Sequence, residues 1–305
     1  MNVAFLFPGQ GSQKVGMGRD WAEAFPESRR VFEEADDVLG FGLTRLCWEG
    51  PEEELTLTAN LQPALVATSV AVLRAVETTG ARPAAVAGHS LGEYSALVAA
   101  GTLELADALR LTRRRGELMQ RAVPVGEGAM AAILALDDDA VRRVVADAAG
   151  GEVLSVANLN APGQVVVAGH RAAVERAVEL ARERGGKPRM LPVSAPFHCP
   201  LMRPAREGLE PVLRETPFRD PEVPVVTNVD ARPAATGAAA RDALVRQVDS
   251  PVRWVESVEW MTDRGGVTAF AELGPGSVLL NTVKRIRPEA ERIELKGPED
   301  LAKLG

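Results

Sequence analysis

Residues 84–95 read Ala-Ala-Val-Ala-Gly-His-Ser-Leu-Gly-Glu-Tyr-Ser, and this stretch decides the fold. The apolar run Ala84–Ala87 predicts a short buried strand, and Glu93–Ala100 predicts a helix. Glycines on both sides of Ser90 let the backbone turn sharply, so this serine is expected in a strained strand-to-helix turn with its hydroxyl exposed. A chance Gly-x-Ser-x-Gly in a loop is the alternative. The strand before and the helix after favour a nucleophile elbow.

The composition is that of an ordinary globular protein. The chain has 305 residues, of which 46% are hydrophobic and 25% are charged, so it is long enough to bury a sizeable core. The formal net charge of −7 argues against bulk attraction to nucleic acid or to an anionic membrane. An acidic protein partner would therefore have to dock on a local basic patch.

Three further features predict a soluble, cytoplasmic protein. Cys47 and Cys199 lie far apart and lack metal-ligand spacing, which is typical of reduced thiols. The first nine residues lack the basic segment of a signal peptide. The longest apolar stretch, residues 61–76, is interrupted by Arg74 and is too short for a membrane span.

The rhythm outside the elbow predicts an α/β fold. Asn2–Phe7 reads as a buried strand that is stopped by a Pro-Gly pair, and helical patterns follow at Trp21–Leu39, Gln62–Thr79 and Leu103–Val123. Strands alternating with helices on this scale favour a parallel sheet covered on both faces. Residues 223–228 and 268–273 are expected to return to the same sheet as further strands.

The middle of the chain changes rhythm. Its predicted order of strand, helix, strand, strand, helix, strand is the ferredoxin-like arrangement. The segments are Gly128–Leu136, Asp138–Ala149, Val153–Asn158, Gln164–Ala168, Arg171–Arg184 and Pro188–Val193, with a turn at Asn160–Gly163. We therefore predict an α/β-hydrolase-like body formed by residues 1–126 and 195–305, with a ferredoxin-like subdomain inserted at 127–194.

A serine hydroxyl is a poor nucleophile unless a base takes its proton, and histidine is the usual base. The chain has three histidines. His89 adjoins Ser90 in sequence, so its side chain is expected to point away and to pack. His170 opens a predicted helix, where a solvated or capping role is expected. His198 lies in a loop bracketed by prolines, where catalytic groups concentrate, and is predicted by elimination to be the base.

A third, acidic group normally orients the histidine, and in elbow hydrolases it precedes the histidine in the chain. Residues 137–139 are acidic, but they begin a predicted helix and are explained by capping. Asp230 and Asp249 follow His198 and stay open as candidates. The alternative is a Ser–His dyad whose histidine is held by backbone carbonyl groups.

An oxyanion hole needs two fixed donors, and one is normally the N–H of the residue after the nucleophile, here Leu91. The glycine-rich loop Phe7–Gln13 is a candidate for the second donor, although an ordinary tight turn is the alternative. Arg113–Arg115 forms a basic run in a predicted helix, and such a run is usually solvated. One arginine turned inward would need a carboxylate or phosphate partner.

These motifs resemble those of the malonyl-CoA:acyl carrier protein transacylases, which belong to the acyltransferase family of fatty-acid and polyketide synthesis. The resemblance extends from the first strand to about residue 286. The matching segments are Phe7–Gln13, Gln62–Leu65, Gly88–Tyr94, Arg115-Gly116 with Met119-Gln120, Asn158–Gly163, Phe197–Met202 and Gly274–Gly276.

The resemblance implies a role for each matching residue. Ser90 would be the nucleophile and His198 its base. The N–H groups of Gln10 and Leu91 would form the oxyanion hole, and the backbone carbonyl of Gln247 would hold the histidine in place of an acid.

Substrate selection is also implied by the resemblance. Arg115, helped by Gln62, would hold the malonyl carboxylate, because a planar guanidinium suits a carboxylate and an acetyl group would leave it unpaired. Phe197 stands where many bacterial fatty-acid enzymes have serine. A phenylalanine at this position resembles the malonyl-selective acyltransferase domains of polyketide synthases. Its bulk is expected to crowd an α-methyl branch. The pathway, fatty acid or polyketide, stays open.

The implied activity is transfer of malonyl from malonyl-CoA to the phosphopantetheine thiol of acyl carrier protein through a malonyl-serine ester. We expect the protein to need no cofactor or metal and to be a monomer. Arg113, Arg114, Lys284 and Arg285 are candidates for docking the acidic carrier protein. Three alternatives stay open: a serine esterase or thioesterase, a polyketide acyltransferase with another extender unit, and a non-catalytic carrier-binding protein.

Overall fold

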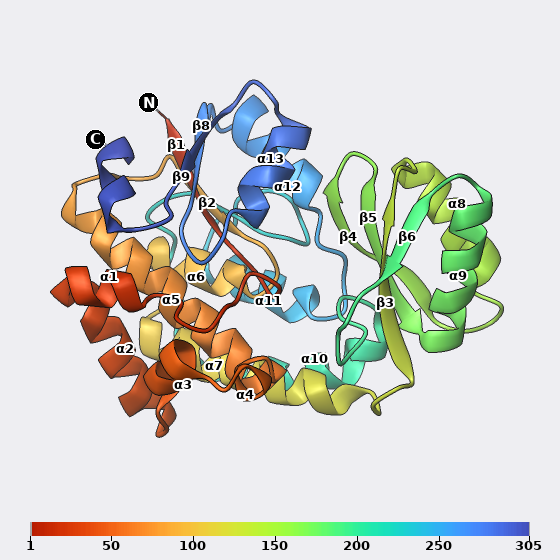
Figure 1. Ribbon diagram of the computed structural model, residues 1–305, viewed down its shortest axis with the longest axis horizontal. Coiled ribbons are helices and arrows are strands. Elements are labelled where there is room, and N and C mark those ends of the chain that lie inside the picture. The colour runs from red at the N-terminus through yellow and green to blue at the C-terminus, as the bar shows by residue number, and fades with distance from the viewer. Residues whose placement is uncertain (1, 305) are drawn as a thin grey trace.

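The computed structural model describes residues 2–304 and has two unequal lobes (Figure 1). The larger lobe contains the parallel sheet, and the smaller lobe contains the antiparallel sheet. The strands are β1 Val3–Phe7, β2 Ala85–Gly88, β3 Gly128–Leu134, β4 Leu154–Ala161, β5 Gln164–His170, β6 Lys187–Met190, β7 Val225–Val226, β8 Ala269–Glu272 and β9 Glu291–Glu294.

Helices cover both sheets. The helices are α1 Arg19–Ala24, α2 Pro26–Leu39, α3 Leu43–Glu49, α4 Glu52–Leu55, α5 Thr58–Thr78, α6 Gly92–Ala99, α7 Leu105–Ala122, α8 Asp138–Ala148, α9 Arg171–Glu183, α10 Arg203–Glu215, α11 Gly237–Gln247, α12 Trp254–Asp263 and α13 Val278–Ile286. Two 3₁₀ turns, Pro200–Met202 and Pro298–Leu304, complete the described chain.

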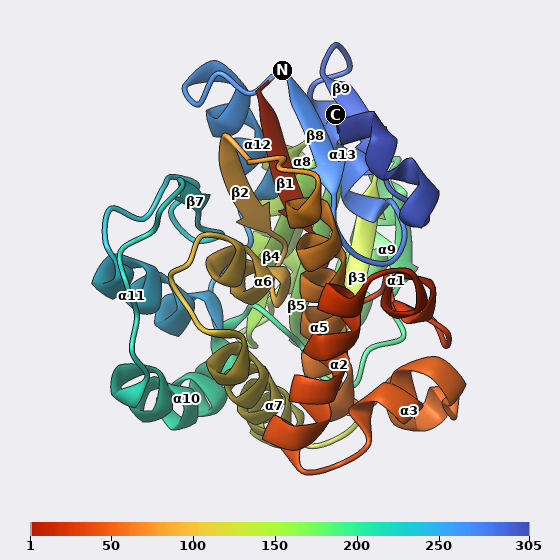
Figure 2. The same ribbon diagram turned by 90° about the vertical axis from the view of Figure 1, so that its left-hand side faces the viewer.

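The larger sheet is parallel throughout, with strand order β7-β2-β1-β8-β9. Figure 2 shows β1 in its centre, between β2 and β8. Every residue of β1, β2 and β8 is buried, because helices cover both faces. The predicted fold class is confirmed for this part of the chain.

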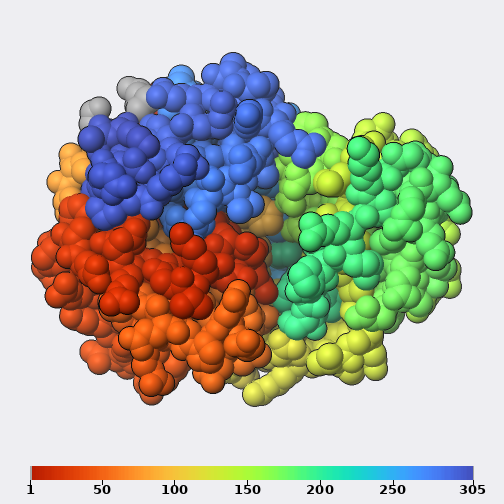
Figure 3. All heavy atoms as spheres, in the orientation of Figure 1, coloured from red at the N-terminus to blue at the C-terminus, as the bar shows by residue number. Residues whose placement is uncertain are grey.

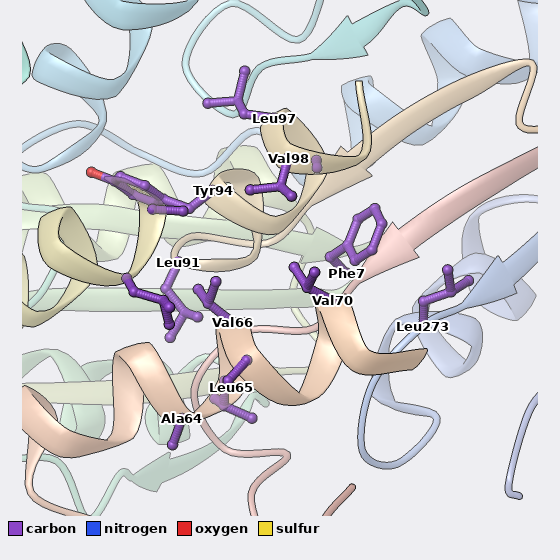
Figure 4. Close-up of a cluster of buried hydrophobic side chains, with 14 of the residues drawn as sticks. Phe7, Ala64, Leu65, Val66, Val70, Leu91, Tyr94, Leu97, Val98 and Leu273 are labelled. Atoms are coloured by element: carbon purple, nitrogen blue, oxygen red, sulfur yellow. The ribbon is translucent and has the colours of Figure 1, made fainter. Parts of the chain in front are cut away.

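The two faces of the sheet carry separate apolar cores. Phe5 and Phe7 of β1 pack on one face against α2, α5, α6 and α7, whereas Ala4 and Leu6 pack on the other against α12 and α13. Figure 4 shows Val66 and Val70 of α5 pointing toward Leu91 and Phe7. Helix α5 is long and apolar enough to cross a membrane, but 83% of its apolar window is buried inside the protein, as in a core helix.

The smaller sheet is antiparallel, with strand order β4-β5-β3-β6. Ala129, Ala131 and Ile133 of β3 pack against α8 and α9. Met130 points to the opposite face and joins the core of the larger lobe. This connectivity is the ferredoxin-like arrangement, as predicted. The sheet and its two helices occupy residues 128–190.

Several predicted limits differ from the observed ones for local reasons. The pattern at Trp21–Leu39 gives two helices, because Phe25 is extended (φ −127°) before Pro26, which begins α2. Helix α5 begins at Thr58, before the predicted start, and accommodates Pro63 in its interior. The predicted turn at 160–163 shortens to Pro162-Gly163, because β4 continues to Ala161.

Candidate active site

The turn between β2 and α6 places Ser90 at a left-handed backbone position, with φ +53°. Such a conformation is costly for a residue with a side chain and is typical of functional turns. A Cβ at Gly88 would lie 1.9 Å from the Gly92 carbonyl carbon, and one at Gly92 would lie 2.1 Å from the Phe7 carbonyl oxygen. Only glycine fits at these two positions, so the elbow predicted from sequence is present.

His198 meets this serine from the loop that follows β6. The Ser90 hydroxyl lies 2.7 Å from His198 Nε2, and His198 Nδ1 donates to the Gln247 carbonyl oxygen at 3.0 Å. The second bond fixes the ring and leaves Nε2 as the acceptor for the serine proton. The geometry is therefore that of a Ser–His dyad oriented by a backbone carbonyl.

The candidate acids lie elsewhere. Asp230 pairs with Arg246 at 2.8 and 2.7 Å, and Asp249 lies 3.4 Å from Arg206. Asp137 caps α8 by accepting the Ala140 N–H at 2.6 Å, as predicted. None of these acids is a hydrogen-bond partner of His198 within residues 2–304.

Burial keeps His198 neutral. Only 3% of the surface of His198 is exposed. Desolvation, and next the positive charge of Arg115, lower the pKa of His198 to about 3, and the bond to the Gln247 carbonyl opposes this shift. The imidazole can therefore accept a proton at neutral pH and at mildly acidic pH.

Arg115 is the only arginine of the basic run 113–115 that turns inward, and it is 2% exposed. Its Nη1 donates to Gln62 Oε1 at 2.7 Å, and its Nη2 donates to Gln247 Oε1 at 3.0 Å and to Ser90 Oγ at 3.2 Å. In the described chain no carboxylate pairs with this guanidinium. A buried cation with neutral partners suits an anionic ligand beside the serine.

Two backbone N–H groups near Ser90 are unpaired. Within residues 2–304, neither Gln10 N–H nor Leu91 N–H donates to a protein acceptor. Both residues lie at the carboxyl ends of adjacent parallel strands, after β1 and β2 respectively. Free donors in this position fit an oxyanion hole.

These groups open into a cavity of about 460 Å³ between the lobes. Ser90, Arg115 and His198 line it from the larger lobe, and Met130 and Val166 line it from the smaller sheet. Figure 3 shows the hollow between the N-terminal loop, in red, and the smaller lobe, in green. Phe197, 8% exposed, forms part of the same wall. A larger cavity of about 590 Å³, lined by residues 14–23 and 274–277, contains none of the predicted site residues.

The structure adds two residues that the sequence pattern did not single out. Asn228 Oδ1 accepts the Ser90 N–H at 2.7 Å, and its Nδ2 donates to the Gly88 carbonyl at 2.7 Å. Glu93, fully buried in α6, accepts the Asn228 N–H and a proton of Gln247 Nε2, both at 2.9 Å. Asn228 is the last residue of a predicted strand, and this position at a strand end was the one available signal for a site residue.

The other two histidines have structural contacts. His89 Nε2 lies 2.8 Å from Asn160 Oδ1 of the smaller sheet, and its ring packs edge-on against Trp254, so the predicted packing role fits. His170 Nδ1 accepts the Val153 N–H at 3.0 Å. Its side chain does not cap α9, so the capping role considered for it is wrong.

The candidate docking residues lie in two places. Arg113 and Arg114 of α7 are half-buried and both pair with Glu117. Lys284 and Arg285 of α13 are exposed, and Arg285 bonds the Gln164 side chain and the Pro162 carbonyl at 2.7 and 2.6 Å. The exposed pair therefore adjoins the β4–β5 hairpin.

Comparison with known proteins identifies relatives along nearly the whole chain. A family model described as "Acyl transferase domain" matches residues 4–296. The malonyl CoA-acyl carrier protein transacylase of Escherichia coli strain K12 is 50% identical over 301 residues, which are 98% of this chain and 97% of the relative.

Solved structures agree with this match. An acyl carrier protein S-malonyltransferase from Vibrio cholerae superimposes with a TM-score of 0.97 at 47% identity, covering all of both chains. A malonyl-transacylase in complex with a type II PKS acyl-carrier protein gives a TM-score of 0.97 at 46% identity, covering 100% of this chain and 99% of that one.

Proposed function

Since the chain belongs to the acyl transferase domain family, we propose that it transfers a malonyl group from malonyl-CoA to acyl carrier protein. The observation that carries this proposal is the buried Arg115 guanidinium, whose Nη2 lies 3.2 Å from Ser90 Oγ. An acyl group on this serine that ends in a carboxylate would meet the one buried cation of the cavity.

Loading of the enzyme follows from the dyad. Ser90 Oγ attacks the thioester carbonyl while His198 Nε2 takes its proton, and the Gln10 and Leu91 N–H groups receive the negative charge on the carbonyl oxygen. The tetrahedral intermediate then expels coenzyme A, whose thiolate takes the proton from His198. The product is malonyl-Ser90.

Discharge repeats these steps with a second thiol. His198 takes the proton of the phosphopantetheine thiol, and its sulfur attacks the serine ester carbonyl. The intermediate expels Ser90, which recovers the proton from His198. Because the donor leaves before the acceptor reacts, the kinetics are ping-pong and the malonyl-enzyme can be isolated.

Arg115 is proposed to select the substrate together with Gln62. Their bond of 2.7 Å fixes one side of the guanidinium, so the malonyl carboxylate can pair with the remaining donors. An acetyl group would leave a desolvated cation unpaired, which costs several kcal/mol of discrimination. Phe197 is proposed to crowd a methyl branch at the α-carbon and so to favour malonyl over methylmalonyl.

The runner-up function is a serine esterase or thioesterase, which would use the same elbow. Such an enzyme would discharge the acyl-serine to water and would need no cation for the acyl group. The buried Arg115 and its neutral partners favour the transferase.

The proposal also covers the oligomeric state, the location, the domain limits and the docking surface. We propose a monomer that acts in the cytoplasm, without nucleic acid or membrane, with a catalytic body of residues 1–126 and 195–305 and a subdomain of residues 127–194. Lys284 and Arg285 are proposed to dock an acidic carrier protein, because they are exposed, whereas Arg113 and Arg114 are half-buried and paired with Glu117.

Intact-protein mass spectrometry tests the function. The enzyme is mixed with malonyl-CoA, methylmalonyl-CoA or acetyl-CoA, and holo acyl carrier protein is added afterwards. We expect a stable malonyl adduct that only the carrier discharges. Loss of the adduct to water without carrier would favour the hydrolase, and a methylmalonyl adduct formed equally fast would refute the role of Phe197. Fatty-acid and polyketide carriers offered side by side would identify the pathway.

A further inference from the structure

The dyad and the arginine share one neighbour, Gln247. Its backbone carbonyl holds His198 Nδ1 at 3.0 Å, and its side-chain Oε1 accepts from Arg115 Nη2 at 3.0 Å. Gln247 Nε2 donates to the Ser90 carbonyl oxygen at 2.9 Å. The base, the substrate-binding cation and the nucleophile therefore all depend on the position of one buried residue.

Glu93 supplies the remaining contact of Gln247. Glu93 Oε2 accepts from Gln247 Nε2 at 2.9 Å and from the Asn228 N–H at 2.9 Å. Asn228 in turn bonds the Ser90 N–H and the Gly88 carbonyl, both at 2.7 Å. One carboxylate oxygen thus connects the two segments that hold the elbow and the histidine.

The hydrogen-bonding capacities of these groups agree with one another. The Ser90 carbonyl only accepts and the Arg115 guanidinium only donates, so the Gln247 amide must point its NH₂ group to the Ser90 carbonyl and to Glu93. Its oxygen then faces the guanidinium of Arg115, which only donates. Among residues 2–304 Glu93 forms no hydrogen bond to the serine hydroxyl or to the guanidinium. Burial lowers the pKa of the guanidinium and the negative charge of Glu93 raises it through space, whereas the hydrogen bond of Glu93 reaches Arg115 through Gln247.

We propose that Glu93 is a positioning residue for substrate selection: it holds Gln247, and through Gln247 it fixes the guanidinium of Arg115 against the acyl group. The proposal rests on the malonyl transfer proposed above. A purely structural role would instead make Glu93 a buried group that stabilises the fold and affects all substrates alike.

The chain contains a matched control in Glu272, at the end of β8. Glu272 is 1% exposed, and its Oε2 also accepts two N–H groups, those of Leu279 and Leu280 at 2.9 and 3.0 Å. Burial raises the pKa of both carboxyl groups to about 7, and in each the Oε1 atom is buried with no hydrogen-bond partner in the described part of the chain. Glu272 does not line the catalytic cavity.

The test compares Glu93→Met, Glu93→Gln and Glu272→Met. Methionine fills the space without accepting a hydrogen bond, whereas glutamine keeps an acceptor oxygen in the Oε2 position. The measured quantity is the ratio of kcat/KM for malonyl-CoA to kcat/KM for acetyl-CoA, with acyl carrier protein as the acceptor. This ratio does not depend on how much of the protein is folded.

We expect Glu93→Met to lower the ratio by about tenfold, which is about 1.4 kcal/mol, and Glu93→Gln to restore most of it. Glu272→Met should keep the wild-type ratio even where it lowers stability. An unchanged ratio in Glu93→Met, an equal loss in Glu272→Met, or a loss in Glu93→Gln as large as that in Glu93→Met would overturn the proposal. A wild-type enzyme without malonyl preference would instead refute the proposed function.

Discussion

The turn from β2 to α6 and the turn from β8 to α13 are built alike. Each follows the carboxyl end of a strand in the parallel sheet, has glycines in it or at its ends, and enters a helix. A buried glutamate lies beside each turn. In the second turn Glu272 accepts the N–H groups of Leu279 and Leu280 at the start of α13. Beside the first turn Glu93 lies inside α6, and the Leu91 N–H has no acceptor among residues 2–304.

This difference separates a structural turn from a catalytic one. Helix N-termini attract negative charge because their first N–H groups lack intrahelical partners. At α13 the protein's own carboxylate satisfies that demand, so an incoming anion finds the donors occupied. At α6 the donor after Ser90 stays free for a charge that develops only during the reaction.

Replacing the serine at each turn with alanine should produce the largest difference in malonyl transfer. Ser90→Ala removes the nucleophile and should abolish the malonyl adduct, with a loss of at least about 10⁴-fold in transfer rate. Ser277, the residue before α13, does not line the catalytic cavity, so Ser277→Ala should transfer malonyl at the wild-type rate. Malonyl label retained by Ser90→Ala in intact-mass measurements would contradict the assignment.

Replacing one glycine at each turn with alanine should give the next largest difference, in the free energy of unfolding. Gly92→Ala places a Cβ 2.1 Å from the Phe7 carbonyl oxygen, so β1 must shift, and we expect a loss of more than about 3 kcal/mol in unfolding free energy. At Gly276 a Cβ meets no atom within 4 Å, and only the φ of +83° opposes it, which costs about 1 kcal/mol. Denaturant titration checks both, and equal losses would refute the tight contact.

The ionisation of Glu272 should make stability depend on pH. Burial raises the pKa of this carboxyl to about 7 from 4.5, so the folded state binds its proton more tightly than the unfolded state. Stability is therefore lost as pH rises from about 4.5 through 7, and Glu272→Gln removes that loss. From pH 5.5 to 8 we expect the variant to gain on the order of 2 kcal/mol relative to wild type. A constant difference between the two proteins would show that Glu272 does not titrate there.

The smallest expected effect is a shift in the pH profile of loading. Arg115 is one of the groups that lower the pKa of His198, second to burial. Removing this positive charge in Arg115→Ala should raise the pKa of His198, so the acidic limb of the kcat/KM profile should move to higher pH. Acetyl-CoA serves as donor for both enzymes, because its acyl group has no carboxylate to pair with the guanidinium. A limb that stays in place or moves to lower pH would contradict this coupling.

Much of the fold follows from local sequence signals. The apolar run before Ser90 and the glycines on either side predict the strand and the turn, because their effects act within a few residues. The alternation of strands and helices predicts the parallel sheet, and the order of segments between 127 and 194 predicts the ferredoxin-like arrangement. The split at Phe25-Pro26 was also a local signal, although the helical pattern of the flanking residues obscured it.

The site was less accessible to such reasoning. His198 followed by elimination, because only three histidines are present. Gln247 and Gln62 entered through the family resemblance, and no local pattern distinguished Asn228 or gave Glu93 a role. Their functions depend on hydrogen bonds to residues between 49 and 157 positions away in the chain.

The sequence by itself therefore determined the elbow, because glycine sterics and strand and helix patterns act locally. The tertiary structure decided what surrounds Ser90: a histidine 108 positions away, an arginine 25 positions away and an asparagine 138 positions away. It also decided that the Glu272 carboxylate accepts the N–H groups at the start of α13, whereas Glu93 does not accept the Leu91 N–H. Both glutamates are buried beside similar turns, and only the packing of distant segments determines which backbone donors each carboxylate reaches.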